Sequence, residues 1–476
     1  MLVTASDDFC ISCFVSQKRC YAAARRIDAL TEPLGGLKPA TAAPLTPQNV
    51  QVSKLPNGLV IASLENNSPL SSVGVFVKAG SRYETMENQG VTHVLRLAAN
   101  LVIYSVSPGE INCVVVCLSS SVTSSREAMV YSADCLRKDI DSLLEFLVSV
   151  TTTQEFRPWE VHELTTRVKI DKALAEQCPQ ISVVETLHAA AYKSGLSNSL
   201  YCPDYMVGRV SSEQLHSFVE DTFTSSRMAL VGLGVKHSVL RQVGEGLLSA
   251  RSGSGAPVAQ SLYRGGELRL HNNDDLVHAL IASEGGVMGT AEANAFTVLQ
   301  RILGAGPHVK RGSGLSSKLN QGIAKATAKP FDATAFNASY SDSGLFGVYT
   351  IAQADSAGEV INAAVAQVRG VAEGGLSEAD VLNAKNQVKA EYLMSLETSE
   401  GLLEELGSQA LATAAYQAPE TVLQAIDAVT QGDVVNVSTV TGHIVQSDFN
   451  LFELPHTIQR RRTDVILFIC DACYLF

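Results

Sequence analysis

Charged residues are scarce in this chain. They make up 18% of its 476 residues, aromatic residues make up 6%, and there is a single tryptophan. The formal net charge is −12, and no basic stripe is interleaved with aromatic residues, so a nucleic-acid-binding protein is not expected. There is no run of about 18 or more apolar residues, which predicts that no helix spans a membrane. With 46% hydrophobic residues, the composition indicates a well-packed globular protein.

Motifs for redox cofactors are also missing. The sequence has no dinucleotide fingerprint, no C-x-x-C-H haem attachment and no iron–sulfur spacing, so no cofactor is expected. Ten cysteines in so long a chain do not form a disulfide framework. The pairs Cys10/Cys13 and Cys470/Cys473 could suggest a four-thiolate zinc site. They lie at opposite ends of the chain, so free thiols in a reducing compartment are the preferred interpretation.

The length predicts two or more domains. Residues 1–45 are interpreted as a mitochondrial transit peptide and linker, because Lys18, Arg19, Arg25 and Arg26 lie among small and hydroxyl residues. The acidic residues at positions 7 and 8 argue against that interpretation, and a disordered tail is the alternative. The folded part is expected to begin at the turn formed by residues 55–58.

The two halves of the remaining chain share a pattern. Residues 59–64 and 72–78 have the composition and alternation of strands, and residues 266–272 and 276–283 repeat them. Helical spacing predicts helices at residues 140–150, 158–174, 181–192, 212–223, 290–303, 357–371, 377–396, 401–416 and 419–429. The sequence therefore predicts two similar α+β domains, residues 46–248 and 263–476, joined by a linker at residues 249–262.

Two stretches do not fit this pattern. Residues 102–117 are apolar and lack a helical period, and residues 437–476 lose the rhythm of the preceding helices. Both are rich in cysteine. We interpret them as atypical segments of alternative or mis-joined coding sequence and assign them no function.

A near match to a zinc-peptidase motif lies after the second predicted strand. Residues at positions i, i+3 and i+4 share one face of a helix, so His93, Arg96 and Leu97 should lie together. Inverted zincins place His, Glu and His at these positions, as H-x-x-E-H. Leu97 has no metal-binding atom, and Arg96 carries a fixed positive charge that repels zinc and cannot accept a proton at neutral pH. The motif therefore predicts no hydrolytic activity.

Three other patterns have ordinary structural interpretations. His162-Glu163 resembles the start of H-E-x-x-H, but Thr166 replaces the second histidine, so a solvated helix face is expected. The glycine-rich run from Gly304, together with Lys318, lacks the phosphate-loop spacing and is interpreted as a flexible connection, with a peptide-facing role as a minor alternative. Residues 342–344 are expected to form a turn between strands rather than part of a catalytic triad.

Six stretches of the sequence resemble a known family. They are residues 55–66, 78–84, 187–192, 200–205, 303–312 and 336–347. Through them the chain is similar to the second core subunits of mitochondrial cytochrome b-c1 complexes, within the inverted-zincin superfamily of pitrilysin and processing peptidases. The resemblance implies two similar domains, each a mixed or antiparallel sheet packed with helices. It also implies that Asp171 stands near the third zinc-ligand position.

The same resemblance implies a structural, catalytically dead subunit that binds neither metal nor cofactor. Its expected place is the matrix side of the mitochondrial inner membrane, peripheral to the bilayer. Its expected partners are core protein 1, cytochrome b, cytochrome c1, the Rieske iron–sulfur subunit and the small subunits. A cleaved Rieske targeting peptide is a further candidate ligand. The alternative hypothesis is a non-catalytic, substrate-binding partner of a mitochondrial processing peptidase.

Overall fold

The computed structural model describes residues 49–99, 119–152, 155–246, 253, 255, 259–271, 276–304, 317–439 and 464–469, the last range as backbone alone. The chain separates into two units, Met1–Pro47 and Gln48–Phe476, and all described residues belong to the second. The predicted transit peptide, residues 102–117 and both C-x-x-C pairs lie outside the described residues. We call the described residues up to 246 the first half of the chain and those from 259 onward the second half.

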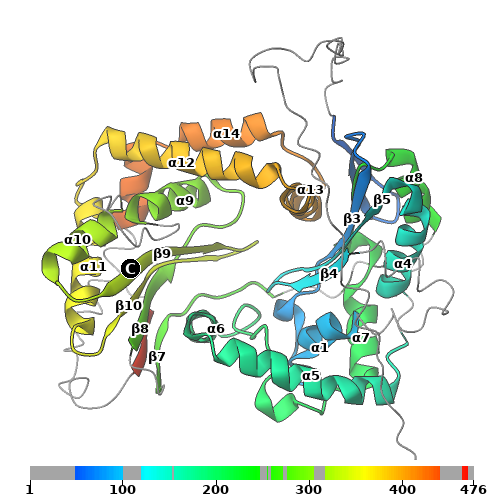
Figure 1. Ribbon diagram of the computed structural model, residues 1–476, viewed down its shortest axis with the longest axis horizontal. Coiled ribbons are helices and arrows are strands. Elements are labelled where there is room, and N and C mark those ends of the chain that lie inside the picture. Colours follow the sequence, from blue (N-terminus) through cyan, green and yellow to red (C-terminus); the bar gives the residue numbers. More distant parts are fainter. Residues whose placement is uncertain are drawn as a thin grey trace, which may run out of the picture. The chain divides into compact units, whose positions relative to one another are not determined.

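The first half is built on a mixed sheet, which has six strands among the described residues (Figure 1). These are β1 (Gln51–Lys54), β2 (Val60–Leu64), β3 (Leu70–Val77), β4 (Ser119–Ser124), β5 (Met129–Leu136) and β6 (Met228–Leu233), in the order β1-β2-β6-β3-β5-β4. Strand β6 runs parallel to β2 and antiparallel to β3. The helices of this half are α1 (Val91–Ala98), α4 (Ile140–Thr152), α5 (Pro158–Glu176), α6 (Pro179–Ala191), α7 (Ser212–Thr222) and α8 (His237–Gly246).

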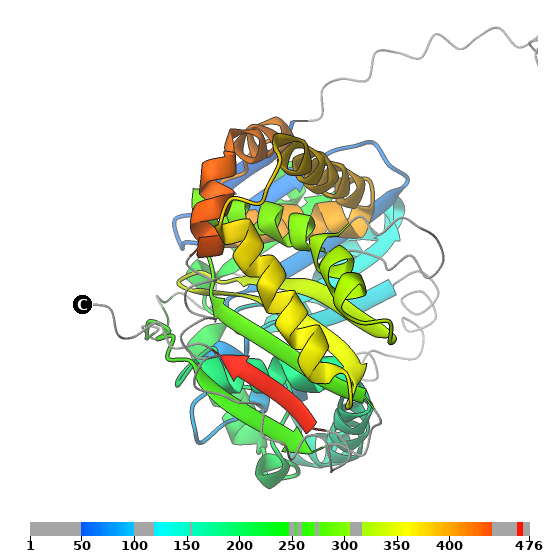
Figure 2. The same ribbon diagram turned by 90° about the vertical axis from the view of Figure 1, so that its left-hand side faces the viewer.

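The second half repeats this plan. Its strands are β7 (Gly266–His271), β8 (Leu276–Glu284), β9 (Phe331–Ser339), β10 (Gly344–Gln353) and β11 (Asp464–Ile469), in the order β7-β11-β8-β10-β9. The order β8-β10-β9 repeats β3-β5-β4, and β11 lies between β7 and β8 as β6 lies between β2 and β3 (Figure 2). Strand β11 nevertheless runs the opposite way, because it is antiparallel to β7 and parallel to β8.

The described residues of this half also form helices. They are α9 (Ala291–Leu303), α10 (Lys318–Ala326), α11 (Ala357–Ala372), α12 (Glu378–Leu396), α13 (Ser399–Thr413) and α14 (Pro419–Ala428). Two sheets packed with helices confirm the predicted α+β class. The domain boundaries at residues 46–248 and 263–476 stay predictions.

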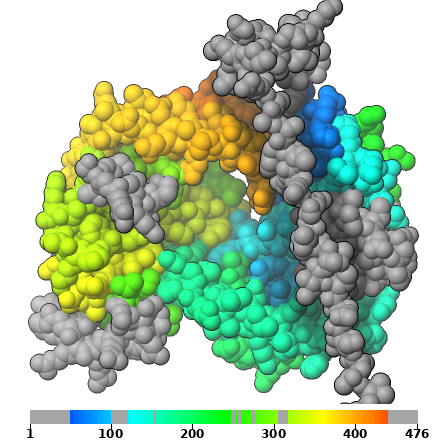
Figure 3. Space-filling model, viewed as in Figure 1, coloured from blue at the N-terminus to red at the C-terminus, as the bar shows by residue number. Residues whose placement is uncertain are grey.

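Each half donates one helix to the sheet of the other half. Helix α6 of the first half packs on β7, β11 and β8, and its Val183, Leu187 and Ala191 share a core with Leu280, Ala282 and Leu345. Helix α13 of the second half packs on β2, β3 and β6, where Leu403, Leu406 and Ala410 share a core with Val60, Ala62 and Phe76. The green surface of α5 and α6 adjoins that of the second half in Figure 3. This exchange buries apolar faces that neither half covers alone, which ties the halves together.

Most predicted elements match observed ones within a few residues, but six observed strands and helices were not predicted. Strand β1 precedes residues 55–58, so the expected start of the folded part was wrong. Helix α10 begins at Lys318, which therefore does not belong to a flexible connection. Helix α8 and the hairpin β4–β5 were also missed, because Ser119–Ser124 is polar and α8 buries only Leu240 and Gly244. Strand β11 was not predicted as part of the sheet either, because its segment was set aside as an atypical tail.

Candidate functional site

The candidate site begins with the first turn of α1. Gly90 precedes this helix with φ = 86°, a left-handed conformation, and a Cβ there would lie 2.6 Å from Sγ of Cys202. The buried carboxylate of Glu84 accepts hydrogen bonds from the Gly90 N–H at 2.8 Å, the Thr92 N–H at 2.9 Å and the Thr92 hydroxyl at 2.6 Å. These contacts satisfy N–H groups that a helix start leaves free. Burial raises the pKa of Glu84 to about 7, although the three hydrogen bonds oppose the shift.

His93 is fully buried, and both of its ring nitrogens are engaged. The Cys202 N–H donates to Nδ1 at 3.0 Å, and Nε2 lies 2.8 Å from Oδ2 of Asp171. A backbone N–H can only donate, so Nδ1 must accept and Nε2 must carry the proton that it donates to Asp171. Burial, assisted by the Arg96 charge, lowers the pKa of His93. The ring is therefore neutral and has no lone pair free for a metal.

Arg96 shares the same carboxylate. Its Nη2 lies 2.5 Å from Oδ2 of Asp171, and the side chains of Arg96 and Asp171 are 28% and 33% exposed. The structure thus brings together three of the predicted residues, His93 and Arg96 from α1 and Asp171 from α5. A guanidinium neutralises the carboxylate here. An active inverted zincin would carry its general base at the Arg96 position.

Leu97 is partly buried and packs against the core of the first half. It offers no donor atom, so His93, Asp171 and Leu97 do not supply the three ligands and open position of catalytic zinc. Among the described residues, no group of three or more His, Cys, Asp or Glu side chains is placed to hold a metal ion. The residues present therefore do not fit zinc, and no hydrolytic step can be derived through it.

A cavity of ≈ 330 Å³ lies beside this cluster. Its walls come from α5, α6, the segment before Pro203 and Leu270 of β7, and they include Tyr201 and Cys202. The Tyr201 ring stands edge-on to His93, with centroids 5.5 Å apart. Burial raises the pKa of Cys202 to about 11, so its thiol is not activated as a nucleophile. The cavity has space for a ligand, and its walls carry the side chains of Lys172, Glu176 and Glu185.

Comparison with known proteins gives family matches over both halves. Residues 60–204 match the insulinase family of M16 peptidases, and residues 209–388 match the M16 inactive domain. The chain is 57% identical over 398 residues to the mitochondrial cytochrome b-c1 complex subunit 2 of Homo sapiens, covering 83% of this chain and 88% of that protein. The Mus musculus protein of the same name is 57% identical over 397 residues, with the same coverage.

The chain belongs to the cytochrome b-c1 complex subunit 2 family. More distant similarity extends to processing peptidases: a probable mitochondrial-processing peptidase subunit alpha-1 of Arabidopsis thaliana is 30% identical over 422 residues, covering 87% of this chain and 84% of that protein. The resemblance noted from the sequence is thus confirmed. Like its family, the chain is a peptidase-like, non-catalytic protein, in keeping with Arg96 and Leu97 at the motif positions.

The remaining sequence patterns have structural roles. His162, Glu163 and Thr166 are all exposed on α5, as predicted. The turn predicted at residues 342–344 is confirmed between β9 and β10. The glycine-rich run after Gly304 lies outside the described residues up to position 316. Sequence reasoning missed Arg82, which lies in one of the family blocks but gave no sign of its partners.

Proposed function

We propose that this chain is the structural core subunit 2 of a mitochondrial cytochrome b-c1 complex, the ubiquinol–cytochrome c oxidoreductase, and supports assembly and stability of that complex. One observation carries the proposal: 57% identity spread over 83% of the chain and 88% of the human relative. The His93, Arg96 and Asp171 cluster supports it, because its hydrogen bonds and charges are satisfied within the protein. No helix among the described residues is long and apolar enough to cross a membrane.

The finer parts of the proposal concern partners and position. The chain pairs with core protein 1 and contacts cytochrome b, cytochrome c1, the Rieske subunit and the small subunits. It sits at the matrix side of the inner membrane. A cleaved Rieske targeting peptide, lodged between the two core subunits, is a further candidate ligand.

Depletion and replacement of the chain test this function. Cells that lack it should lose the assembled complex on blue-native electrophoresis, and the wild-type chain should restore it. The Asp171→Asn variant should restore assembly equally well, because no catalytic step passes through this carboxylate. An assembled complex of normal size in cells without the chain would refute the proposal.

The alternative is a non-catalytic partner in a mitochondrial processing peptidase, favoured by the 30% identity to an alpha subunit of that enzyme. Both hypotheses predict that the isolated chain lacks zinc and does not cleave a presequence peptide, so the proteins that co-purify with it distinguish them. The purified chain should contain no stoichiometric zinc and should not cleave the peptide. Zinc-dependent cleavage would overturn the scaffold function, and co-purification with an active peptidase subunit would favour the alternative.

A further inference from the structure

Equivalent hairpins of the two sheets meet at their tips. The β4–β5 tip contains Arg126 and Glu127, and the β9–β10 tip consists of residues 340–343. Each tip is held by the segment that follows its neighbouring strand: the Arg82 N–H donates to the Arg126 carbonyl at 2.8 Å, and the Met288 N–H donates to the Tyr340 carbonyl at 2.9 Å. The two arrangements are alike in backbone but differ in side chain. Only the first half places an arginine there.

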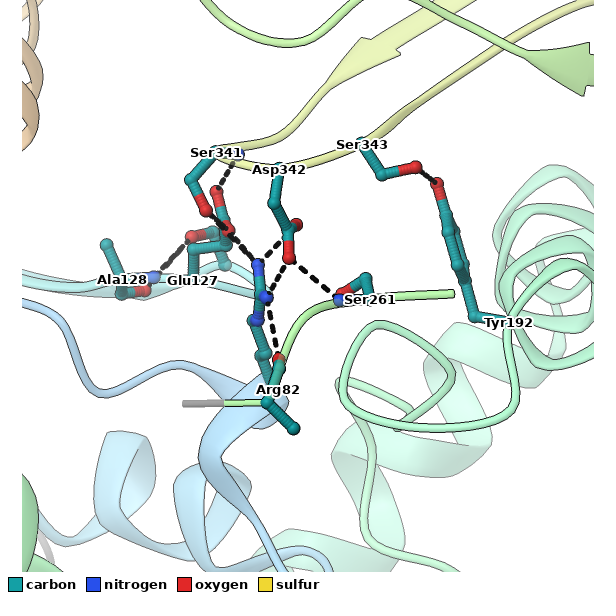
Figure 4. A network of polar contacts seen from close by, with 10 residues as sticks. Arg82, Glu127, Ala128, Tyr192, Ser261, Ser341, Asp342 and Ser343 are labelled. Carbon is teal, nitrogen blue, oxygen red and sulfur yellow. Dashed lines mark hydrogen bonds and ion pairs between the residues drawn. The ribbon is translucent and has the colours of Figure 1, made fainter. Parts of the chain in front are cut away.

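The Arg82 guanidinium is shared by both tips (Figure 4). Its Nη1 lies 2.6 Å from Oε1 of Glu127 and 2.7 Å from Oδ1 of Asp342, and its Nη2 pairs with Oδ2 of Asp342. The Arg82 side chain is 4% exposed, and those of Glu127 and Asp342 are 18% and 19% exposed. One buried cation thus neutralises part of the charge of two carboxylates, one from each half. Hydrogen bonds between ionised groups in such a setting are strong and directional.

Every residue of the second tip binds the first half. The Ser341 N–H donates to Oε2 of Glu127 at 3.0 Å. Oη of Tyr340 lies 2.6 Å from Nε2 of His188, and Oγ of Ser343 lies 3.0 Å from Oη of Tyr192. Asp342 also accepts from the Ser261 N–H at 2.8 Å, just before β7. A four-residue turn therefore fits into complementary polar groups on Arg82, on the β4–β5 tip and at the C-terminal end of α6.

These contacts differ in kind from the exchanged helices. Apolar packing of α6 and α13 is non-directional and tolerates small rotations. The bidentate pair between Arg82 and Asp342 does not tolerate such rotations, because both of its hydrogen bonds require a narrow range of angles. We propose that Arg82, Glu127, Ser341 and Asp342 form an inter-half latch, which sets the angle between the two sheets and can be released while each sheet stays folded.

The latch opens when the positive charge of Arg82 is removed. Without the Arg82 cation, the carboxylates of Glu127 and Asp342 face each other partly buried and repel. The β9–β10 tip then leaves the first half, and α6 loses polar contacts that align it on β8. The cavity beside Tyr201 has a wall from each half, through Leu270, so its width depends on the same latch. The latch lies within the chain itself, whichever complex contains it.

Hydrogen–deuterium exchange of the full chain tests the latch. Arg82→Gln should speed amide exchange at least tenfold in α6, in residues 259–263 and in residues 340–344, while the central strands β2, β3, β6, β8 and β10 keep their protection. Asp342→Asn should speed exchange in the same segments by a smaller factor, because Arg82 keeps its ion pair with Glu127. The isosteric Asp342→Asn also provides the test if Arg82→Gln does not fold.

Arg227→Gln is the matched control. Arg227 and Arg82 are equally buried, each with 7% of the whole residue exposed. Arg227, however, donates to the Lys78 carbonyl and stacks over Tyr83 within the first half. Its loss should speed exchange near residues 78–83 and leave residues 340–344 unchanged. Unchanged exchange at residues 340–344 in both latch variants would overturn the proposal. An equal rise in the exchange rate across all strands of both sheets would also overturn it, because such a rise indicates global destabilisation.

Discussion

His93 and Asp171 lie in direct contact, with 2.8 Å between Nε2 and Oδ2, and the histidine is the donor. In a metal site the same nitrogen would offer its lone pair. Here Arg96 supplies the positive charge that Asp171 requires, and the Cys202 N–H fixes the tautomer of the ring. Where an active inverted zincin holds metal ligands, these side chains instead satisfy one another by hydrogen bonds.

The pKa of His93 should move in opposite directions in two variants. Burial lowers it most, Asp171 raises it and Arg96 lowers it. Arg96→Met should therefore raise the pKa, and Asp171→Asn should lower it further. Titration of the labelled histidine ring by NMR measures both, with the resonance assigned by its loss in His93→Gln. Shifts of the same sign would contradict the ion pair.

Glu84 should make the chain less stable as pH rises. Its pKa is about 7 in the folded state, above its ordinary value of 4.5, so the folded state binds more protons between these values. Its contribution is complete below pH 4.5 and is lost as pH rises through 7. Glu84→Gln should remove this dependence and cost about 1 kcal/mol at pH 8, because its amide cannot accept from both Gly90 and Thr92. Urea unfolding of both proteins across pH 4–8 measures how the free energy of unfolding depends on pH. The same slope in Glu84→Gln as in wild type would contradict the prediction.

His188 should have the opposite effect. Burial and the Arg126 charge lower its pKa to about 3, while a hydrogen bond to the Val184 carbonyl resists the change. Because the folded-state pKa lies below the ordinary value of 6.5, its contribution is complete above pH 6.5 and is lost as pH falls toward 3. Compared with wild type, His188→Gln should lose about 1–2 kcal/mol less stability between pH 6.5 and 5. Equal losses in both proteins would contradict a neutral, buried His188.

Helix α13 crosses the first sheet at Gly407. A Cβ at this position would lie 2.1 Å from Cζ of Phe76, which is itself buried. Gly407→Ala should therefore destabilise the protein by about 1–3 kcal/mol, despite the gain in helix propensity. Gly370→Ala in α11 is the control, because a Cβ there has nothing within 4 Å and should stabilise by about 0.5–1 kcal/mol. Denaturant unfolding measures the free energy of unfolding of both variants. Equal gains in both variants would show that α13 does not approach Phe76 closely.

Local pattern predicted much of this fold and little of its long-range contacts. The spacing of apolar residues located α5 and α12 because both have a buried stripe set by Val161, Leu164 and Val168 or by Val381, Ala384 and Val388. The same periodicity could not show that α6 and α13 cover the opposite sheets, since an apolar face does not specify its partner. Asp171 lies beside His93, but its equivalence to the third zinc-ligand position of the superfamily stays a prediction. Arg82 and Asp342 are 260 residues apart, and no local signal links them.

The exchanged helix α13 imposes an order on how this chain can fold. The face of the first sheet formed by Val60, Ala62 and Phe76 is complete only when Ser399–Thr413 arrives. If the chain leaves the ribosome at about 5–20 residues per second, that apolar face waits roughly ten to thirty-five seconds after β6 has emerged. A nascent chain is therefore a partly folded intermediate with an exposed apolar face on its first sheet. We expect chaperones to bind at this face.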